Sequence, residues 1–174
     1  MPSRRSALCC VAAGVLALLP TDGPAFGAAT PPPDQQEFCA LVGQWRASAA
    51  VPDPVLRQHA IQSAGAAAIT YIEQHRGIDW IGTIGRISVA GGGNAAGELE
   101  VCPSAWAGGL SPEGGLDSDT WAEPETHVFD RLHAAKEGQK AEIRAALLGV
   151  YDKHADFPAK IWLRARLIDL TVLP

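Results

Sequence analysis

Residues 78–90, IDWIGTIGRISVA, are the stretch of sequence that decides the fold. The stretch is rich in β-branched residues and alternates in polarity, which predicts a strand with Ile81 and Ile87 on its inward face. Gly82 and Gly85 interrupt it, and glycines inside a strand mark a bulge or the tight bend of a barrel corner. The segment therefore predicts a curved strand that opens a β-barrel.

Further strand patterns follow this segment. Residues 91–94, GGGN, predict a turn, and residues 97–102 alternate as a second, half-buried strand. Residues 103–125 are rich in Gly, Pro, Ser and acidic residues, which predicts a long loop. A short third strand is expected within it, near Thr120-Trp121-Ala122.

The last part of the chain predicts a helix and two more strands. Thr126 is a candidate N-cap for a short helix that ends at Gly138. Residues 141–147 and 160–173 alternate in polarity as the fourth and fifth strands. Three strands, a helix and two strands are the order of an OB-fold, a five-stranded Greek-key barrel.

Two helices are predicted before the barrel. Asp34 is a candidate cap for the first helix, in which apolar residues recur at helical spacing. Asp53 followed by Pro54 is a good start for the second helix, which should end near His75 before Gly77. The apolar face of this pair must be buried against the barrel or against a second copy of the chain, so a homodimer is an open alternative.

Residues 1–27 have the three-part pattern of a secretory signal. Arg4 and Arg5 form a basic start, and residues 8–19 are an apolar run shorter than the about 20 residues that span a bilayer. Small residues around 25–27 offer a cleavage point, and the paired arginines also resemble a twin-arginine signal. An ordinary first helix is the alternative. We expect a periplasmic or secreted protein that is not an integral membrane protein once the signal is removed.

These patterns predict the organisation of the whole chain. We expect an α+β protein with a signal peptide at 1–27, a flexible arm at 28–33, a two-helix segment at 34–76 and an OB-like barrel at 77–174.

Cysteine usage depends on that signal. Cleavage would remove Cys9 and Cys10 and leave Cys39 and Cys102. In an oxidising compartment two cysteines suggest one disulfide, which would pin the first helix to the second strand. Two buried free thiols are the alternative, because free cysteine packs as a small apolar residue.

The net charge of the protein limits the classes of partner that it could bind. The 174 residues carry a net charge of −5, which becomes −6 without residues 1–27. This acidity argues against a protein that binds nucleic acid through charge alone. The charge is also uneven, since residues 98–125 hold seven acidic and no basic residues, whereas residues 131–166 hold eight basic and four acidic ones.

Outward positions on neighbouring strands gather arginine and tryptophan. If Ile143, Leu163 and Leu167 face inward, six residues face outward and could stack a planar or anionic ligand. These candidate ligand-binding residues are Trp80, Arg86, Arg144, Trp162, Arg164 and Arg166. The alternative is that the arginine stems only cover the barrel wall and that the two helices cover the tryptophans.

Two short motifs resemble small bacterial OB-like domains of the anticodon-binding type. Residues 79–84, DWIGTI, are similar to their W-x-G-x-V opening, and residues 132–143, LHAAKEGQKAEI, to their entry into the fourth strand. The resemblance covers residues 78–173. Ala141 replaces the usual Val, and Ala145-Ala146 stand where a Gly often follows. The resemblance implies a fold more than a function.

The sequence lacks the common catalytic motifs. It has no G-x-S-x-G elbow and no Gly-rich phosphate loop followed by a helix. We therefore expect a non-catalytic exported module with no cofactor or metal, binding an anionic small molecule, a peptide or an envelope protein. Two alternatives stay open: a single-stranded nucleic-acid binder by OB analogy, and a hydrolase that uses Asp or His residues of loops 103–125 and 151–159.

Overall fold

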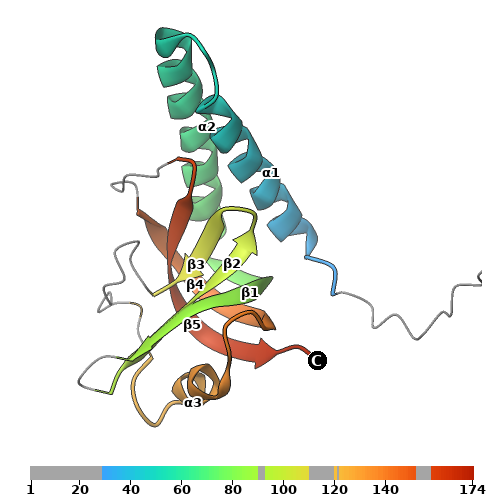
Figure 1. The fold of residues 1–174 in the computed structure, drawn as a ribbon, viewed down its shortest axis with the longest axis vertical. Helices are drawn as coiled ribbons and strands as arrows, with labels where there is room; N and C mark the ends of the chain where they lie inside the picture. The colour runs from blue at the N-terminus through green and yellow to red at the C-terminus, as the bar shows by residue number, and fades with distance from the viewer. Residues whose placement is uncertain (1–28, 90–92, 110–119, 121, 152–157) are drawn as a thin grey trace, which may run out of the picture.

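The computed structural model describes residues 29–89, 93–109, 120, 122–151 and 158–174. The predicted signal at 1–27 lies outside these residues. Within them, two helices precede a five-stranded barrel and a third helix lies between the third and fourth strands (Figure 1). The elements are α1 (Pro33–Ser48), α2 (Pro54–Gln74), β1 (Gly77–Val89), β2 (Ala95–Cys102), β3 (Ala105–Gly108), α3 (His127–Ala134), β4 (Lys140–Tyr151) and β5 (Ile161–Val172).

The strands close into a barrel in the order β1-β2-β3-β5-β4. All neighbouring strands are antiparallel except β3 and β5, which run parallel. β1 pairs with β4, and β4 pairs with β5, as in an OB-fold. This is an OB-like Greek-key barrel, and the chain is an α+β protein as predicted.

The third strand lies elsewhere than the sequence predicts. β3 spans only Ala105–Gly108, at the start of the stretch predicted as a loop. Ala122 makes an isolated bridge to Ala95, and Trp121 lies outside the described residues. A four-residue strand in a Gly- and Pro-rich stretch has no alternation of its own, so its partners β2 and β5 define it.

The inward face of β1 is the opposite of the predicted one. Ile78, Trp80 and Ile84 are buried, whereas Ile81 is half-buried on the other side. The register shifts between Ile84 and Ile87, so a bulge lies where the glycines indicated one. A bulge inverts the alternation, and extrapolating the pattern backward from Ile87 therefore assigns residues 78–84 to the wrong face.

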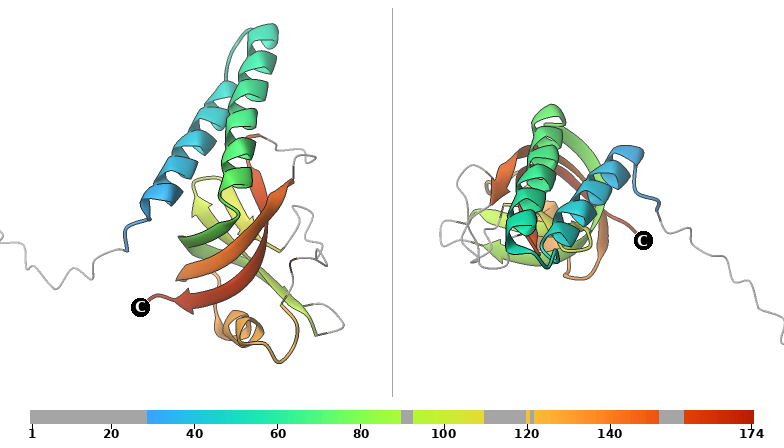
Figure 2. Two further views of the ribbon diagram at one scale, coloured as in Figure 1. Left: turned by 180° about the vertical axis from the view of Figure 1, so that it is seen from behind. Right: turned by 90° about the horizontal axis from the view of Figure 1, so that it is seen from above.

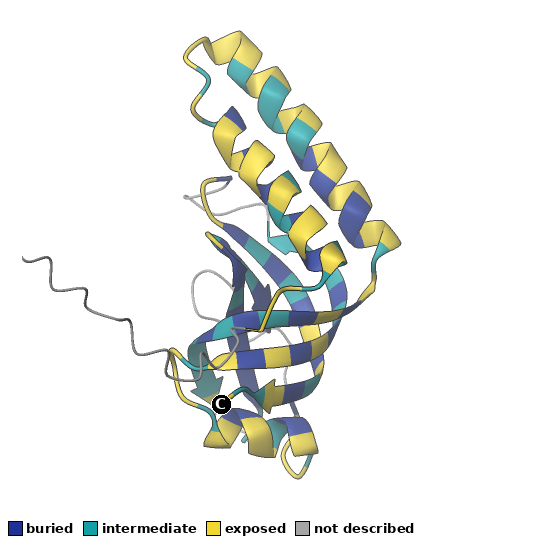
Figure 3. Cartoon of the chain, turned by 90° about the vertical axis from the view of Figure 1, so that its right-hand side faces the viewer, coloured by how far each residue is buried: buried dark blue, intermediate teal, exposed yellow. Residues whose placement is uncertain are grey.

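The helices α1 and α2 form a hairpin that extends beyond one end of the barrel (Figures 1 and 2). α2 begins as predicted, because the Asp53 carboxylate accepts hydrogen bonds from the backbone N–H groups of Val55 and Leu56, each at 2.9 Å. α1 begins one residue earlier than Asp34, at Pro33. The half of the hairpin farther from the barrel is largely exposed (Figure 3). The buried side chains of the two helices line the seam between them and the junction with the barrel.

The junction between α1 and the barrel is polar as well as apolar. The fully buried Gln35 donates from Nε2 to the carbonyl oxygens of Ile81 and Val101, at 2.5 and 2.7 Å. Its Oε1 accepts a hydrogen bond from the Ile81 N–H at 2.9 Å. This one side chain therefore bridges β1 and β2 beyond their last paired residues, Thr83 and Glu100.

The short helix α3 lies against the opposite end of the barrel (Figure 1). Thr126 caps it as predicted, accepting a hydrogen bond from the Phe129 N–H at 3.3 Å. The helix ends at Ala134, and Gly138 takes a positive φ of 86° in the turn that leads into β4. Arg131 fastens it to β5 through Asp169 and the Leu170 carbonyl.

Candidate functional site

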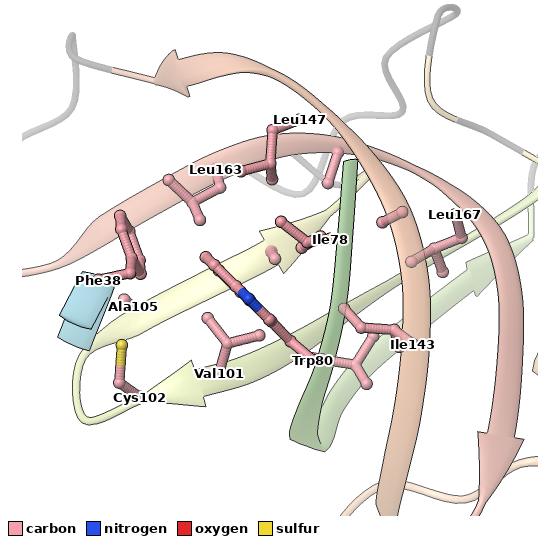
Figure 4. Close-up of a cluster of buried hydrophobic side chains, with 14 of the residues drawn as sticks. Phe38, Ile78, Trp80, Val101, Cys102, Ala105, Ile143, Leu147, Leu163 and Leu167 are labelled. Atoms are coloured by element: carbon pink, nitrogen blue, oxygen red, sulfur yellow. The ribbon is translucent and has the colours of Figure 1, made fainter. Parts of the chain in front are cut away.

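The inward side chains of the barrel are closely packed. Alanine at five inward positions makes room for Trp80 and for the leucines and isoleucines around it (Figure 4). These alanines are Ala105, Ala107, Ala141, Ala145 and Ala165, each with no exposed surface. Side chains that could contact a ligand are therefore found on the outer side of the strands.

Trp80 is part of this core, which corrects the prediction that it faces outward. Its side chain is fully buried and stacks on Phe38 of α1, with ring centroids 5.0 Å apart. Its indole N–H donates to the Asp34 carboxylate at 2.8 Å. Phe38 of α1 packs against this inward-facing ring, so α1 contacts Trp80 within the core rather than covering it on the outside of the barrel.

Trp162, Arg164 and Arg166 do face outward from β5, as predicted. They alternate with the buried Ile161, Leu163 and Ala165, so successive side chains of the strand lie on opposite faces. Trp162 and Arg164 are half-buried, and Arg166 is exposed.

Two further aromatic side chains join them from neighbouring strands. Trp162 is in register with Trp106 on β3 and with Tyr151 on β4. The two indoles are stacked, with centroids 5.0 Å apart and planes 19° from parallel. The Arg164 guanidinium carbon lies 5.8 Å from the centre of the Tyr151 ring, within cation–π range. We call these five residues, Trp106, Tyr151, Trp162, Arg164 and Arg166, the aromatic–arginine face.

Trp106 and Tyr151 were not among the sequence-predicted site residues. Trp106 sits in the stretch predicted as a loop, and Tyr151 lies four residues beyond the predicted end of the fourth strand. Only the register of β3 and β4 on β5 aligns them with Trp162. Uninterrupted alternation on β4 would place Tyr151 inward with Ile143 and Leu147, and the register shift between Leu147 and Gly149 places it on the outer side instead.

Arg144 lies on the outer side of β4, nearer its start. It is in register with Asp79 on β1, and its Nε lies 2.9 Å from the Asp79 carboxylate. This contact raises the pKa of Arg144 above its ordinary value. Both residues line a surface hollow of about 430 Å³ that also includes Glu142 and Asp169. Three carboxylates and one arginine make this hollow a poor receptor for an anion.

Arg86 lies on another pair of strands. It forms an ion pair with Glu98 of β2, with Nη2 and Oε2 3.2 Å apart. The Glu98 side chain is only 12% exposed, so the charge of Arg86 is matched within the protein. The six predicted residues thus separate into three that share a face on β5, two with carboxylate partners elsewhere and one in the core.

Cys39 and Cys102, for which the sequence allows either a disulfide or two buried free thiols, lie on α1 and β2. Both are free thiols; Cys102 is buried and Cys39 is half-buried.

The described residues do not include the loop aspartates and the histidine of the catalytic alternative. Among them, no three His, Cys, Asp or Glu side chains are gathered closely enough to hold a metal ion. The loop residues proposed for hydrolysis fall largely within 110–119 and 152–157, outside the described part of the chain. No helix of that part is long and apolar enough to cross a membrane.

No family model matches the chain, and no curated protein is significantly similar to it.

Proposed function

We propose that the protein is an exported, non-catalytic binding module whose ligand lies on the aromatic–arginine face. The observation that carries the proposal is the row of three aromatic rings, Trp106, Trp162 and Tyr151, set across three neighbouring strands with Arg164 over one end. Export rests on the signal pattern of residues 1–27.

The chemistry of this face favours a ligand that is both flat and anionic. Stacking on an aromatic side chain is worth about 1–3 kcal/mol per ring in proteins that bind unpaired bases. Arg164 and Arg166 add positive charge at the edge of the same row, and a guanidinium can also stack on a planar group. Since the protein as a whole is acidic, attraction depends on these nearby charges and should weaken as salt rises.

A fluorescent planar anion, 8-anilinonaphthalene-1-sulfonate, tests this proposal. We expect saturable binding that Trp162→Ala weakens by about 5–100-fold, because one stacking surface is lost. Arg164→Gln should weaken the binding more strongly at low salt than at high salt. Arg86→Gln is the matched control, since Arg86 lies outside the face, and it should leave the affinity within about twofold.

Far-UV circular dichroism of each variant shows whether the fold is kept. Equal weakening by Trp162→Ala and Arg86→Gln, or binding that no variant of the face alters, would contradict the proposal.

A single-stranded nucleic acid is the second candidate ligand, because stacked tryptophans beside arginine are a surface on which bases can stack. Two features oppose it: the net charge is negative, and β2, one of the strands on which OB ligands usually lie, carries Glu98 and Glu100. A ten-residue oligothymidylate titrated at low salt should give binding that falls steeply with added salt if this alternative is right. An unchanged polarisation would remove it.

A further inference from the structure

Cys39 and Cys102 lie at the seam between the helical hairpin and the barrel. The Cys39 thiol donates to the carbonyl of Val101, the residue before Cys102, at 3.6 Å. One helical turn earlier, Gln35 donates to the same carbonyl. Figure 4 shows the Cys102 sulfur beside the turn of α1 that carries Phe38. The contact joins positions far apart in the chain.

The two thiols differ in access and in acidity. Cys39 is half-buried, whereas Cys102 is 7% exposed. The neighbouring Cys102 thiol stabilises the Cys39 thiolate and lowers the pKa of Cys39, although burial acts in the opposite direction. The same contact raises the pKa of Cys102, and burial and the charges of Cys39 and Glu100 raise it further. Because the thiolate is the reactive form, Cys39 is the better nucleophile of the pair.

We propose that Cys39 and Cys102 are a redox-active pair, in which Cys39 attacks an external disulfide and Cys102 completes an intramolecular bond that locks α1 onto β2. The oxidant is a disulfide of the glutathione class or of a thiol–disulfide exchange protein. This inference does not depend on the ligand-binding proposal.

The exchange proceeds in two steps. The Cys39 thiolate forms a bond to one sulfur of the external disulfide, whose S–S bond breaks and releases one thiolate. Cys102 then loses its proton and attacks Cys39 Sγ, which releases the second external thiolate. The two cysteines together lose two electrons and two protons, and the external disulfide gains both as two thiols.

Oxidation should stabilise the fold. A bond between residues 39 and 102 closes a long loop in the unfolded chain, so the unfolding equilibrium constant should fall by roughly 10²–10³-fold. The amide hydrogens of α1 should exchange more slowly with solvent in the oxidised protein, because local opening of the helix from β2 is blocked.

The experiment uses the full chain with Cys9→Ser and Cys10→Ser, so that only this pair can react. Folded protein is incubated with oxidised glutathione, and its mass and cysteine-containing peptides are measured. We expect the loss of two hydrogen atoms and a crosslinked pair of peptides. In this background Cys102→Ser should accumulate glutathione on Cys39, whereas Cys39→Ser should acquire it on Cys102 at least tenfold more slowly.

A second measurement covers the case in which a serine variant does not fold. In the reduced background protein, brief treatment with N-ethylmaleimide should label Cys39 before Cys102. The proposal is overturned if both thiols persist in the folded protein after oxidant, or if the crosslink forms only in urea. Faster reaction at Cys102 than at Cys39 would also overturn it.

Discussion

At the scale of single residues, Gln35 shows how a helix can complete a sheet. Its amide makes three hydrogen bonds to the backbone of Ile81 and Val101, where β1 and β2 are no longer paired with each other. A buried peptide group without a hydrogen-bond partner costs about 1–3 kcal/mol. The contacts of Gln35 satisfy backbone groups that would otherwise be left unpaired where the two strands separate. The side chain thereby couples the position of α1 to the opening between two strands.

We expect Gln35→Ala to lower the free energy of unfolding by about 2–4 kcal/mol, because it leaves these backbone groups buried and unpaired. Urea denaturation measures the loss. Gln36→Ala is the matched control, since the exposed Gln36 side chain only donates to the Pro31 carbonyl; its effect should stay within about 0.5 kcal/mol. Similar losses for the two variants would show that Gln35 does not have this role.

Tyr71 gives the fold a dependence on alkaline pH. Its hydroxyl donates to the Asp34 carbonyl at 2.6 Å, and burial, followed by the nearby negative charge of Asp34, raises its pKa from 10.0 to about 12. The neutral form is therefore favoured in the folded state. The neutral Tyr71 hydroxyl contributes fully to stability below pH 10, where the tyrosine is protonated in both the folded and the unfolded state. This contribution is lost as the pH rises through 12.

Absorbance at the tyrosinate band should accordingly show a tyrosine that titrates near pH 12 in the folded protein. In Tyr71→Phe the late-titrating group should be absent, and the fall in stability between about pH 10 and 12 should be smaller. Retention of the late titration in Tyr71→Phe would assign it to Tyr151 instead.

The orientation of Trp80 is the part of the candidate site that could not be predicted from the sequence. Alternation on β5 correctly placed Trp162, Arg164 and Arg166 outward, because β5 keeps one register along its pairing with β3. On β1 the bulge between Ile84 and Ile87 inverts the pattern. The glycines predicted the bulge, but its consequence for Trp80 depends on which residue is left unpaired, and this is set by β2.

At the scale of the elements, local signals were the most reliable. Asp53 before Pro54 and Thr126 before α3 cap helices through contacts within four residues, so the sequence contains all that is needed to predict them. β3 is the opposite case, since four residues with little pattern become a strand by pairing with β2 and, in parallel, with β5. Closing the barrel is therefore a property of strands far apart in the chain.

The packing of α1 on α2 leads to a prediction at this scale. A Cβ atom added to Gly65 would lie 2.9 Å from the Trp45 ring, closer than side chains tolerate. Gly65→Ala should therefore lower the free energy of unfolding by about 1–3 kcal/mol. At Gly43, also helical, a Cβ atom would meet nothing within 4 Å. There, Gly43→Ala should raise stability by about 0.5–1 kcal/mol by favouring the helix.

Chemical denaturation of both variants measures this difference, and each is the control for the other. Equal effects of the two substitutions would mean that helix propensity alone, rather than contact with Trp45, determines the outcome.

At the scale of the whole molecule, the candidate site is assembled from three strands. Trp106, Tyr151 and Trp162 come from β3, β4 and β5, and none of the three is near another in the sequence. The sequence could give the composition of β5, because alternation is local, but the row of rings exists only once the register of the closed barrel is known. The fold class was predictable from the order of elements, whereas this site was predictable only in part.

The core is also a property of the whole molecule, since one buried apolar cluster runs from α1 and α2 into the barrel. Phe38 stacks on Trp80, and Gln35 fills the gap between β1 and β2. We therefore expect residues 29–174 to unfold in a single transition, with tryptophan fluorescence and far-UV circular dichroism giving coincident curves.

A fragment of residues 77–174 should lose this cooperativity, because removal of the helices exposes Trp80 and leaves buried backbone groups of Ile81 and Val101 without their partner. Its near-UV circular dichroism should be weak, and its urea transition should be broad. A sharp transition of the fragment, with the near-UV signal of the intact protein, would instead mean that the barrel is an independent domain to which the hairpin is only attached.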